Sequence, residues 1–166
     1  MAPHGTSSSS DQPEPARLLI VGLGNPLMAD DGIGHAVVRR LMECELPSGI
    51  RLHAIEGDVL ALAELWNGEQ TVWLVDAVSG DSPAGTLRVF EHQELLGLPA
   101  GGLSTHQMSV SESLRWLLHG KPEMAAVRFR LFGVEVGVLR PEEGLSQVVK
   151  EPVCRLADEI RAAVES

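Results

Sequence analysis

The chain has 166 residues, of which 44% are hydrophobic and 22% are charged, and these proportions are ordinary for a globular protein. Its formal net charge of -10 argues against a broad nucleic-acid-binding face, because non-specific affinity for nucleic acids comes from Lys and Arg. No stretch approaches the roughly 20 apolar residues of a membrane-spanning helix. The two cysteines lack the spacing of a zinc site. We therefore expect a cytoplasmic protein with one hydrophobic core.

The first 16 residues contain Ser, Pro, Gly and acidic residues but no apolar run. This composition predicts a disordered tail over residues 1–16. It does not fit a signal peptide, which needs a central apolar region. We expect residues 17–166 to form one α/β domain.

Apolar runs alternate with helical periodicity through the rest of the chain. Strands are predicted at Leu18–Leu23, Arg51–Glu56, Thr71–Ala77, Thr86–Phe90 and Val127–Val134. Helices are predicted at Gly34–Glu45, Leu60–Trp66, Gln107–Leu118 and Leu145–Ala163. The alternation indicates a single three-layer α/β domain, a mostly parallel twisted sheet with helices on both faces. The connection before the fourth strand is short, so that strand is expected to run antiparallel, and Pro152 predicts a kink or a break in the last helix.

The most informative segment is Gly24–Gly34, GNPLMADDGIG, which joins the first strand to the first helix. Ligands of open α/β sheets bind where parallel strands end. A phosphate-binding loop there would offer bare backbone N–H groups to an anion, whereas Asp30 and Asp31 repel an anion and favour a cation. One of these two residues is a good candidate for the helix N-cap, so the other is the candidate functional carboxylate.

Two further polar residues stand at similar places in the predicted fold. Asp76 ends the apolar run VWLV, where an ionised carboxylate is costly unless it is paired, solvated or bound to a metal; capping of a turn is the alternative. His106 lies in GGLSTHQM before an apolar helix, where Ser104 or Thr105 can supply the cap. A parallel sheet can bring Asp31, Asp76 and His106 into one crevice, and this O,O,N donor set suits a divalent ion such as nickel or zinc.

The combination of these motifs resembles the maturation endopeptidases of NiFe hydrogenases. The resemblance covers nearly everything from residue 17 to residue 166. It rests on the following segments, in this order: LLIVGLGN leading to DDGIG, then LVDA, STHQM, LFGV and the later GLS. The resemblance implies a cytoplasmic α/β protein, similar in fold to the phosphorylase/hydrolase group, that removes a C-terminal extension from the hydrogenase large subunit once nickel is in place.

Matched position by position, the family's metal-binding and catalytic residues are Asp31, Asp76 and His106. Some members carry Glu where this chain has Asp31. A second difference is Glu56-Gly57-Asp58, where members often have an acidic residue followed by two glycines. That loop is associated with recognition of the cleavage region, so the resemblance implies that Glu56 and Gly57 contact substrate. The substrate would bring the nickel, and the protease is expected to be a monomer.

Three other functions stay open at this point. Peptidyl-tRNA hydrolases also begin with a strand followed by GLGNP, but they continue into a basic, histidine-containing stretch, whereas this chain reads ADDG. A dinucleotide-binding domain is a second alternative, although Gly22 and Gly24 match the GxGxxG motif only in part. The third is a chaperone that holds hydrogenase precursors without cutting them.

Overall fold

The computed structural model describes residues 16–103, residue 105 and residues 108–166. Nearly all of the expected N-terminal tail lies outside these residues, so both the tail and the domain boundary stay predictions. The strands are β1 (Leu18–Leu23), β2 (Ile50–Ile55), β3 (Thr71–Val78), β4 (Leu87–Glu91) and β5 (Arg128–Glu135). The α-helices are α1 (Ile33–Met42), α2 (Leu62–Leu65), α3 (His92–Gly97), α4 (Val110–Gly120) and α5 (Gln147–Glu165). Short 3-10 helices are found at Ala29–Gly32, Val59–Ala61 and Pro122–Ala126.

The strands form one five-stranded sheet in the order β2-β1-β3-β5-β4. Strands β2, β1, β3 and β5 pair in parallel, and β4 pairs with β5 in the antiparallel sense. The short connection before β4 explains its direction, as the sequence predicted. All five predicted strands are present, and each strand end lies within one residue of its predicted position. The predicted fold class is confirmed.

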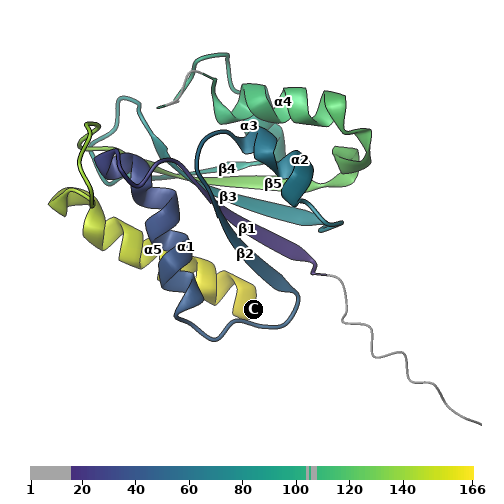
Figure 1. Cartoon of the computed structure of the whole chain (residues 1–166), viewed down its shortest axis with the longest axis horizontal. Helices are drawn as coiled ribbons and strands as arrows, with labels where there is room; N and C mark the ends of the chain where they lie inside the picture. Colours follow the sequence, from purple (N-terminus) through teal and green to yellow (C-terminus); the bar gives the residue numbers. More distant parts are fainter. Residues whose placement is uncertain (1–15, 104, 106–107) are drawn as a thin grey trace, which may run out of the picture.

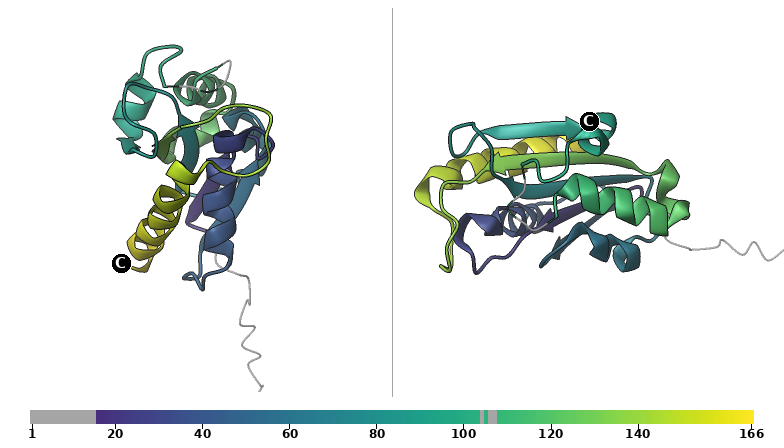
Figure 2. Two further views of the ribbon diagram at one scale, coloured as in Figure 1. Left: turned by 90° about the vertical axis from the view of Figure 1, so that its left-hand side faces the viewer. Right: turned by 90° about the horizontal axis from the view of Figure 1, so that it is seen from above.

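Helices cover both faces of the sheet (Figures 1 and 2). Helices α1 and α5 pack on one face, over a core that includes Ile20, Val75 and Phe132. Helices α2, α3 and α4 pack on the other, over a core that includes Leu74 and Phe129. Alternating residues of the central strands thus enter opposite cores, which explains why their sequences are continuously apolar.

Several helix predictions differ from the structure. Helix α1 ends at Met42 and not at Glu45, and the first part of the helix predicted at Leu60–Trp66 belongs to the 3-10 helix Val59–Ala61. Helix α3 was not predicted, because its six residues are too few for a clear helical period; a capping box between Glu91 and Glu94 begins it. Helix α4 begins at Val110 and not at residue 107, since Ser109 and Glu112 form the capping box in place of Ser104 or Thr105. The sequence predicted a kink or a break at Pro152; there is no break, because α5 continues through Pro152.

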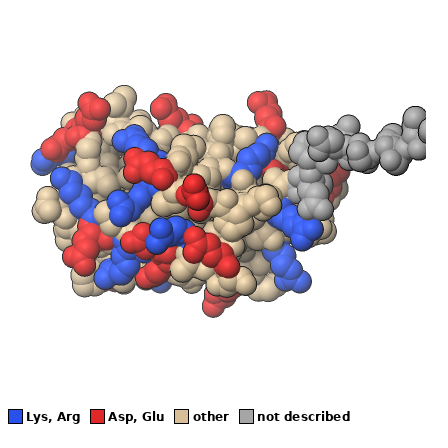
Figure 3. Space-filling model, turned by 90° about the horizontal axis from the view of Figure 1, so that it is seen from below, with Lys and Arg blue, Asp and Glu red and all other residues tan. Residues whose placement is uncertain are grey.

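Charged side chains are mixed by sign on the face of the molecule shown in Figure 3. Lys and Arg side chains lie between Asp and Glu side chains there, and no continuous basic surface forms. No helix in the described part of the chain is both long and apolar enough to cross a bilayer.

A close backbone contact fixes helix α1 against the ends of β1 and β3. A Cβ atom placed on Gly34 would lie 2.4 Å from the carbonyl oxygens of both Leu23 and Val75. A Cβ on Gly22 would lie 2.1 Å from the carbonyl oxygen of Gly34. These are backbone atoms and cannot move aside, so the two glycines set how near the start of α1 approaches the sheet.

We expect Gly34→Ala to lower the free energy of unfolding by about 1–3 kcal/mol, the range for overpacking a close-packed site. Gly120→Ala is the matched control, because no atom lies within 4 Å of a Cβ at that helical position. Chemical denaturation of both variants provides the measurement. Equal stability of the two variants would contradict the role given to the contact at Gly34.

Candidate functional site

The segment that carries the two carboxylates connects the end of β1 to the start of α1. Gly24 has a φ of +115°, and a Cβ there would lie 1.9 Å from the carbonyl oxygen of Asp31. Residues 29–32 form a 3-10 turn in which every residue is buried. The DDGIG motif is therefore packed at the carboxyl edge of the sheet, where the sequence placed it.

Asp30 is completely buried and fastens the loop between β5 and α5. One carboxylate oxygen, Oδ2, accepts hydrogen bonds from the backbone N–H groups of Gly137 and Val138, each at 2.8 Å, and from the Ser146 hydroxyl at 2.7 Å. Oδ1 accepts a bond from the backbone N–H of Ser146, also at 2.7 Å. Asp30 therefore has a structural role that is complete without a ligand.

Burial alone would raise the pKa of Asp30, but these donors outweigh it. The Ser146 hydroxyl and backbone N–H, followed by the N–H groups of Val138 and Gly137, hold the pKa of Asp30 below its usual value. Donors that bind the ionised form favour that form. Asp30 is consequently a charged, buried anchor at neutral pH.

Asp31 faces a different set of partners. Its Oδ2 accepts a hydrogen bond of 2.8 Å from the backbone N–H of Asn25, and its Oδ1 accepts one of 2.9 Å from the Thr105 hydroxyl. Gly32 occupies the N-cap position of α1, and no side chain caps it. The expectation that one of the two aspartates caps this helix was therefore wrong. The two carboxylates have separate roles, as predicted, but the structural one, that of Asp30, is to anchor a distant loop and not to cap the helix.

Asp76 lies on β3, whose ladder to β5 continues two residues further, to Val78. It does not end the strand, as the sequence suggested, although it lies just beyond Val75, the last β3 residue in the β1 ladder. Its side chain is 2% exposed, and Oδ1 accepts a hydrogen bond of 2.8 Å from the backbone N–H of Ala77. The ladder between β1 and β3 therefore ends just before this carboxylate.

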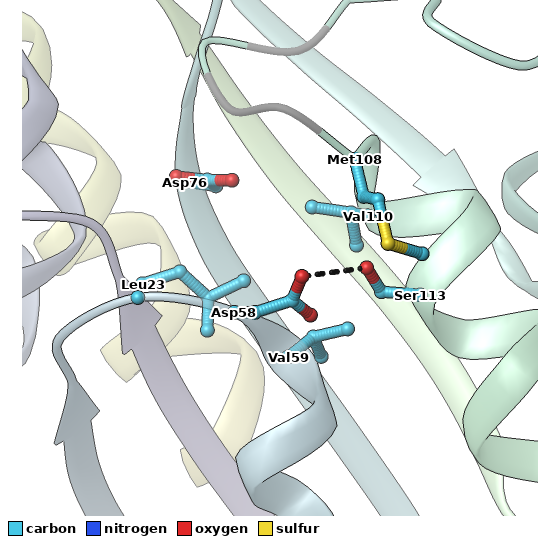
Figure 4. Close-up of a pocket in the computed structure, with 8 residues that line it drawn as sticks. Leu23, Asp58, Val59, Asp76, Met108, Val110 and Ser113 are labelled. Carbon is cyan, nitrogen blue, oxygen red and sulfur yellow. Dashed lines mark hydrogen bonds between the residues drawn. The ribbon is translucent and has the colours of Figure 1, made fainter.

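A pocket of about 250 Å³ opens beside Asp76. Figure 4 shows Asp76 at one end of it and the side chains of the α4 start across from Leu23. Its lining comes from four separate parts of the chain: Leu23, Gly57, Asp58, Val59, Asp76, Met108, Val110 and Ser113. Within the pocket, the Ser113 hydroxyl donates a hydrogen bond of 3.0 Å to Asp58 Oδ2.

The structure brings together part of the predicted site. Gly57 and Asp76 line the same pocket, while Asp31 lies at the same edge of the sheet but does not line it. Glu56 is exposed and borders a different depression, on the outer side of β2. His106 lies outside the described residues. Within those residues, no three His, Cys, Asp or Glu side chains gather as a metal site.

Two features of this site were missed from the sequence. Thr105 was considered only as a helix cap, yet its hydroxyl binds Asp31, and Ser113 was not considered at all. Each makes a hydrogen bond to a carboxylate far away in the chain, 74 and 55 residues distant. The sequence contains no pattern that indicates such contacts, apart from the position of Thr105 next to His106.

A family model described as HycI, hydrogenase maturation protease, matches residues 56–163, which is more than half of the chain. The chain belongs to the hydrogenase maturation protease family. The resemblance stated from the motifs is thus confirmed, and so is the prediction that the protein is a peptidase. Membership in this family also decides against the peptidyl-tRNA hydrolase and dinucleotide-binding alternatives.

Individual proteins are similar to this chain over most of its length. Protein FrxA of Pyrococcus furiosus is 28% identical over 138 residues, which cover 82% of this chain and 97% of FrxA. The hydrogenase maturating endopeptidase HybD from Escherichia coli superposes with a TM-score of 0.75 at 22% identity, over 90% of this chain and 92% of that one. The [NiFe] hydrogenase maturation protease HybD from Thermococcus kodakarensis gives 0.72 at 24% identity, over 89% and 99%. The two structures show that the fold is shared.

The lowered pKa of Asp30 leads to a stability prediction. A depressed pKa in the folded state contributes stability above the unfolded-state value of 3.8, and this contribution is lost as the pH falls through the folded-state pKa. We expect Asp30→Asn to lower the free energy of unfolding at pH 7 by about 1.5–3 kcal/mol, the range for a hydrogen bond to a charged group.

The difference between wild type and Asp30→Asn should begin to shrink below about pH 4, because protons bind the Asp30 carboxyl of the unfolded chain there before they bind it in the folded protein. Urea denaturation between pH 3 and pH 7 measures this difference in the free energy of unfolding. Asp158→Asn, at an exposed position of α5, is the control and should track wild type. A difference for Asp30→Asn that stays constant across this range would contradict the anchoring role of the charge.

Proposed function

We propose that this protease removes the C-terminal extension of a NiFe-hydrogenase large-subunit precursor after nickel insertion, and that Asp31, Asp76 and His106 contact the nickel of the precursor. The observation that carries the proposal is the placement of two buried carboxylates, Asp31 and Asp76, at the carboxyl edge of β1 and β3. Both are almost completely buried, at 6% and 2% exposure. Buried carboxylates at a ligand-binding edge are typical of functional sites.

The donor chemistry fits nickel that arrives with the substrate. Carboxylate oxygens, together with an imidazole, are acceptable ligands for a divalent first-row metal. The two described carboxylates fall short of a full coordination shell, and the remaining positions would be filled by the precursor's own ligands. The protease then needs no resident ion, and contact with Asp31 and Asp76 would report that the precursor is loaded.

The chain's own groups can supply the proton transfers of peptide hydrolysis. In the proposed reaction a water molecule adds to the scissile carbonyl carbon, and its proton passes to one of the two carboxylates. The C–N bond then breaks, and the leaving amine takes up that proton. Asp76 lines the pocket, whereas Asp31 does not, so we assign the proton transfer to Asp76.

The reaction is tested by intact-mass spectrometry of the precursor after incubation with the protease, with and without nickel loaded. We expect loss of a C-terminal peptide from the nickel-loaded precursor only. Cleavage of both forms would contradict recognition of nickel. Stable binding of the loaded precursor without any change in mass would favour the chaperone alternative.

Asp76→Asn should reduce the cleavage rate at least about 100-fold, the lower range for loss of a positioned acid–base group. The amide oxygen can still accept the Ala77 N–H, so the fold should be retained, which circular dichroism checks. Asp158→Asn removes an equal charge at an exposed site and should cleave normally. Full activity of Asp76→Asn would reject the assignment of this residue.

Thr105→Val should lower the cleavage rate about 10–100-fold, the range for groups that orient a metal ligand. Valine keeps the shape of threonine but cannot donate the 2.9 Å hydrogen bond to Asp31. Thr105→Ser keeps the hydroxyl and should restore most of the rate. If serine and valine at this position were equally slow, the hydrogen bond would not be the cause.

A further inference from the structure

We propose that the pocket between Asp76 and helix α4 binds an uncharged apolar side chain of the precursor next to the scissile bond, and that its walls limit the size of that side chain. This inference rests on the proposed function. It adds a specificity site that includes Val59, Val110 and Ser113, residues outside the expected metal-contacting and substrate-contacting sets.

Most of the pocket wall is aliphatic or thioether surface. Leu23 is the last residue of β1, Val59 begins the 3-10 helix after β2, and Met108 and Val110 lie at the start of α4. Figure 4 shows these side chains facing the same space from opposite sides. A volume of about 250 Å³ admits one side chain and excludes a folded element. Binding of an apolar side chain against such walls is favourable, because it removes apolar surface from water.

Three carboxylate oxygens of the pocket already accept hydrogen bonds within the protein. Asp58 Oδ1 accepts the backbone N–H of Leu60 at 2.9 Å, and Oδ2 accepts the Ser113 hydroxyl at 3.0 Å. Asp76 Oδ1 accepts the Ala77 N–H. An acidic side chain that entered would meet two carboxylates, and a basic one would give up its water to reach oxygens that already accept hydrogen bonds within the protein. An uncharged apolar side chain avoids both costs.

The position of Asp76 indicates which part of the precursor reaches the pocket. Asp76 lines it and is also the residue to which we assign the proton transfer. An extended peptide advances about 3.3 Å per residue. A precursor whose scissile carbonyl lies at Asp76 therefore places a side chain from within one or two residues of the cleaved bond into the pocket.

The test is a substitution scan of the nickel-loaded precursor over the three residues on each side of the scissile bond. Gly, Ala, Val, Leu, Phe, Lys and Asp are placed at each position, and kcat/KM is measured with the wild-type protease. At one position we expect kcat/KM to rise from Gly to Leu by about tenfold or more, as for apolar groups in a matched pocket. Lys and Asp should be poor there.

Two protease variants connect this position to the pocket. Val110→Phe adds bulk at the wall and should lower kcat/KM about tenfold for the Leu precursor, but less than about twofold for the Ala precursor. Val110→Ala enlarges the pocket and should shift the preference towards Phe. Val89→Phe is the matched control, since Val89 is exposed on β4, away from the pocket. It should leave the wild-type profile unchanged.

Two results would overturn the proposal while leaving the proposed function intact, because the wild-type enzyme still cleaves the unaltered precursor in both. One is a scan in which side-chain size has no effect at any position, or an effect that neither Val110 variant changes. The other is a preference for Lys that disappears in Asp58→Asn, which would show that the pocket binds a cation through the Asp58 carboxylate.

Discussion

The buried carboxylate of Asp30 joins the start of the first helix to a loop more than one hundred residues later in the chain. Its four hydrogen bonds to Gly137, Val138 and Ser146 are supported by backbone bonds from Ala29 N–H to Glu142 and from Asp30 N–H to Val138. The 3-10 turn that carries Asp31 is thereby fixed on its inner side. The anchor therefore fixes the backbone from which the Asp31 carboxylate projects.

The layers of the fold could be predicted because they depend on local patterns. Continuous apolar runs such as that of β1 identify strands covered on both faces, and these runs enter the two cores as expected. The strand order could not be predicted, because it is set by pairing between distant segments. Pro152 shows a similar limit. Its ring packs within 3 Å of the position that a Cβ on Gly85 would occupy, a contact that the sequence does not reveal.

The site was predictable to a lesser degree. The sequence singled out Asp76, because a carboxylate next to an apolar run is costly unless it is paired, solvated or bound to a metal, although β3 continues to Val78 and does not end at Asp76. The pair at residues 30 and 31 indicated two roles. The partners could not be derived. Asp30 pairs with the loop that contains the GLS segment, but nothing in the sequence linked Ser146 of that segment to Asp30. The capping role assigned to Ser104 or Thr105 belongs to Ser109, since α4 begins at Val110, and the Thr105 hydroxyl binds Asp31.

The 3-10 conformation of the turn explains how two adjacent carboxylates come to differ. With three residues per turn, successive side chains point about 120° apart, so Asp30 and Asp31 cannot face the same partners. One faces inward to the loop after β5, and the other faces Asn25 and Thr105 at the edge of the sheet. Because donors on two separate segments hold the oxygens of Asp31 at fixed positions, the reach of this carboxylate is set by the fold. A glutamate here, as in some members of the family, would need both donors to move outward by about one methylene length.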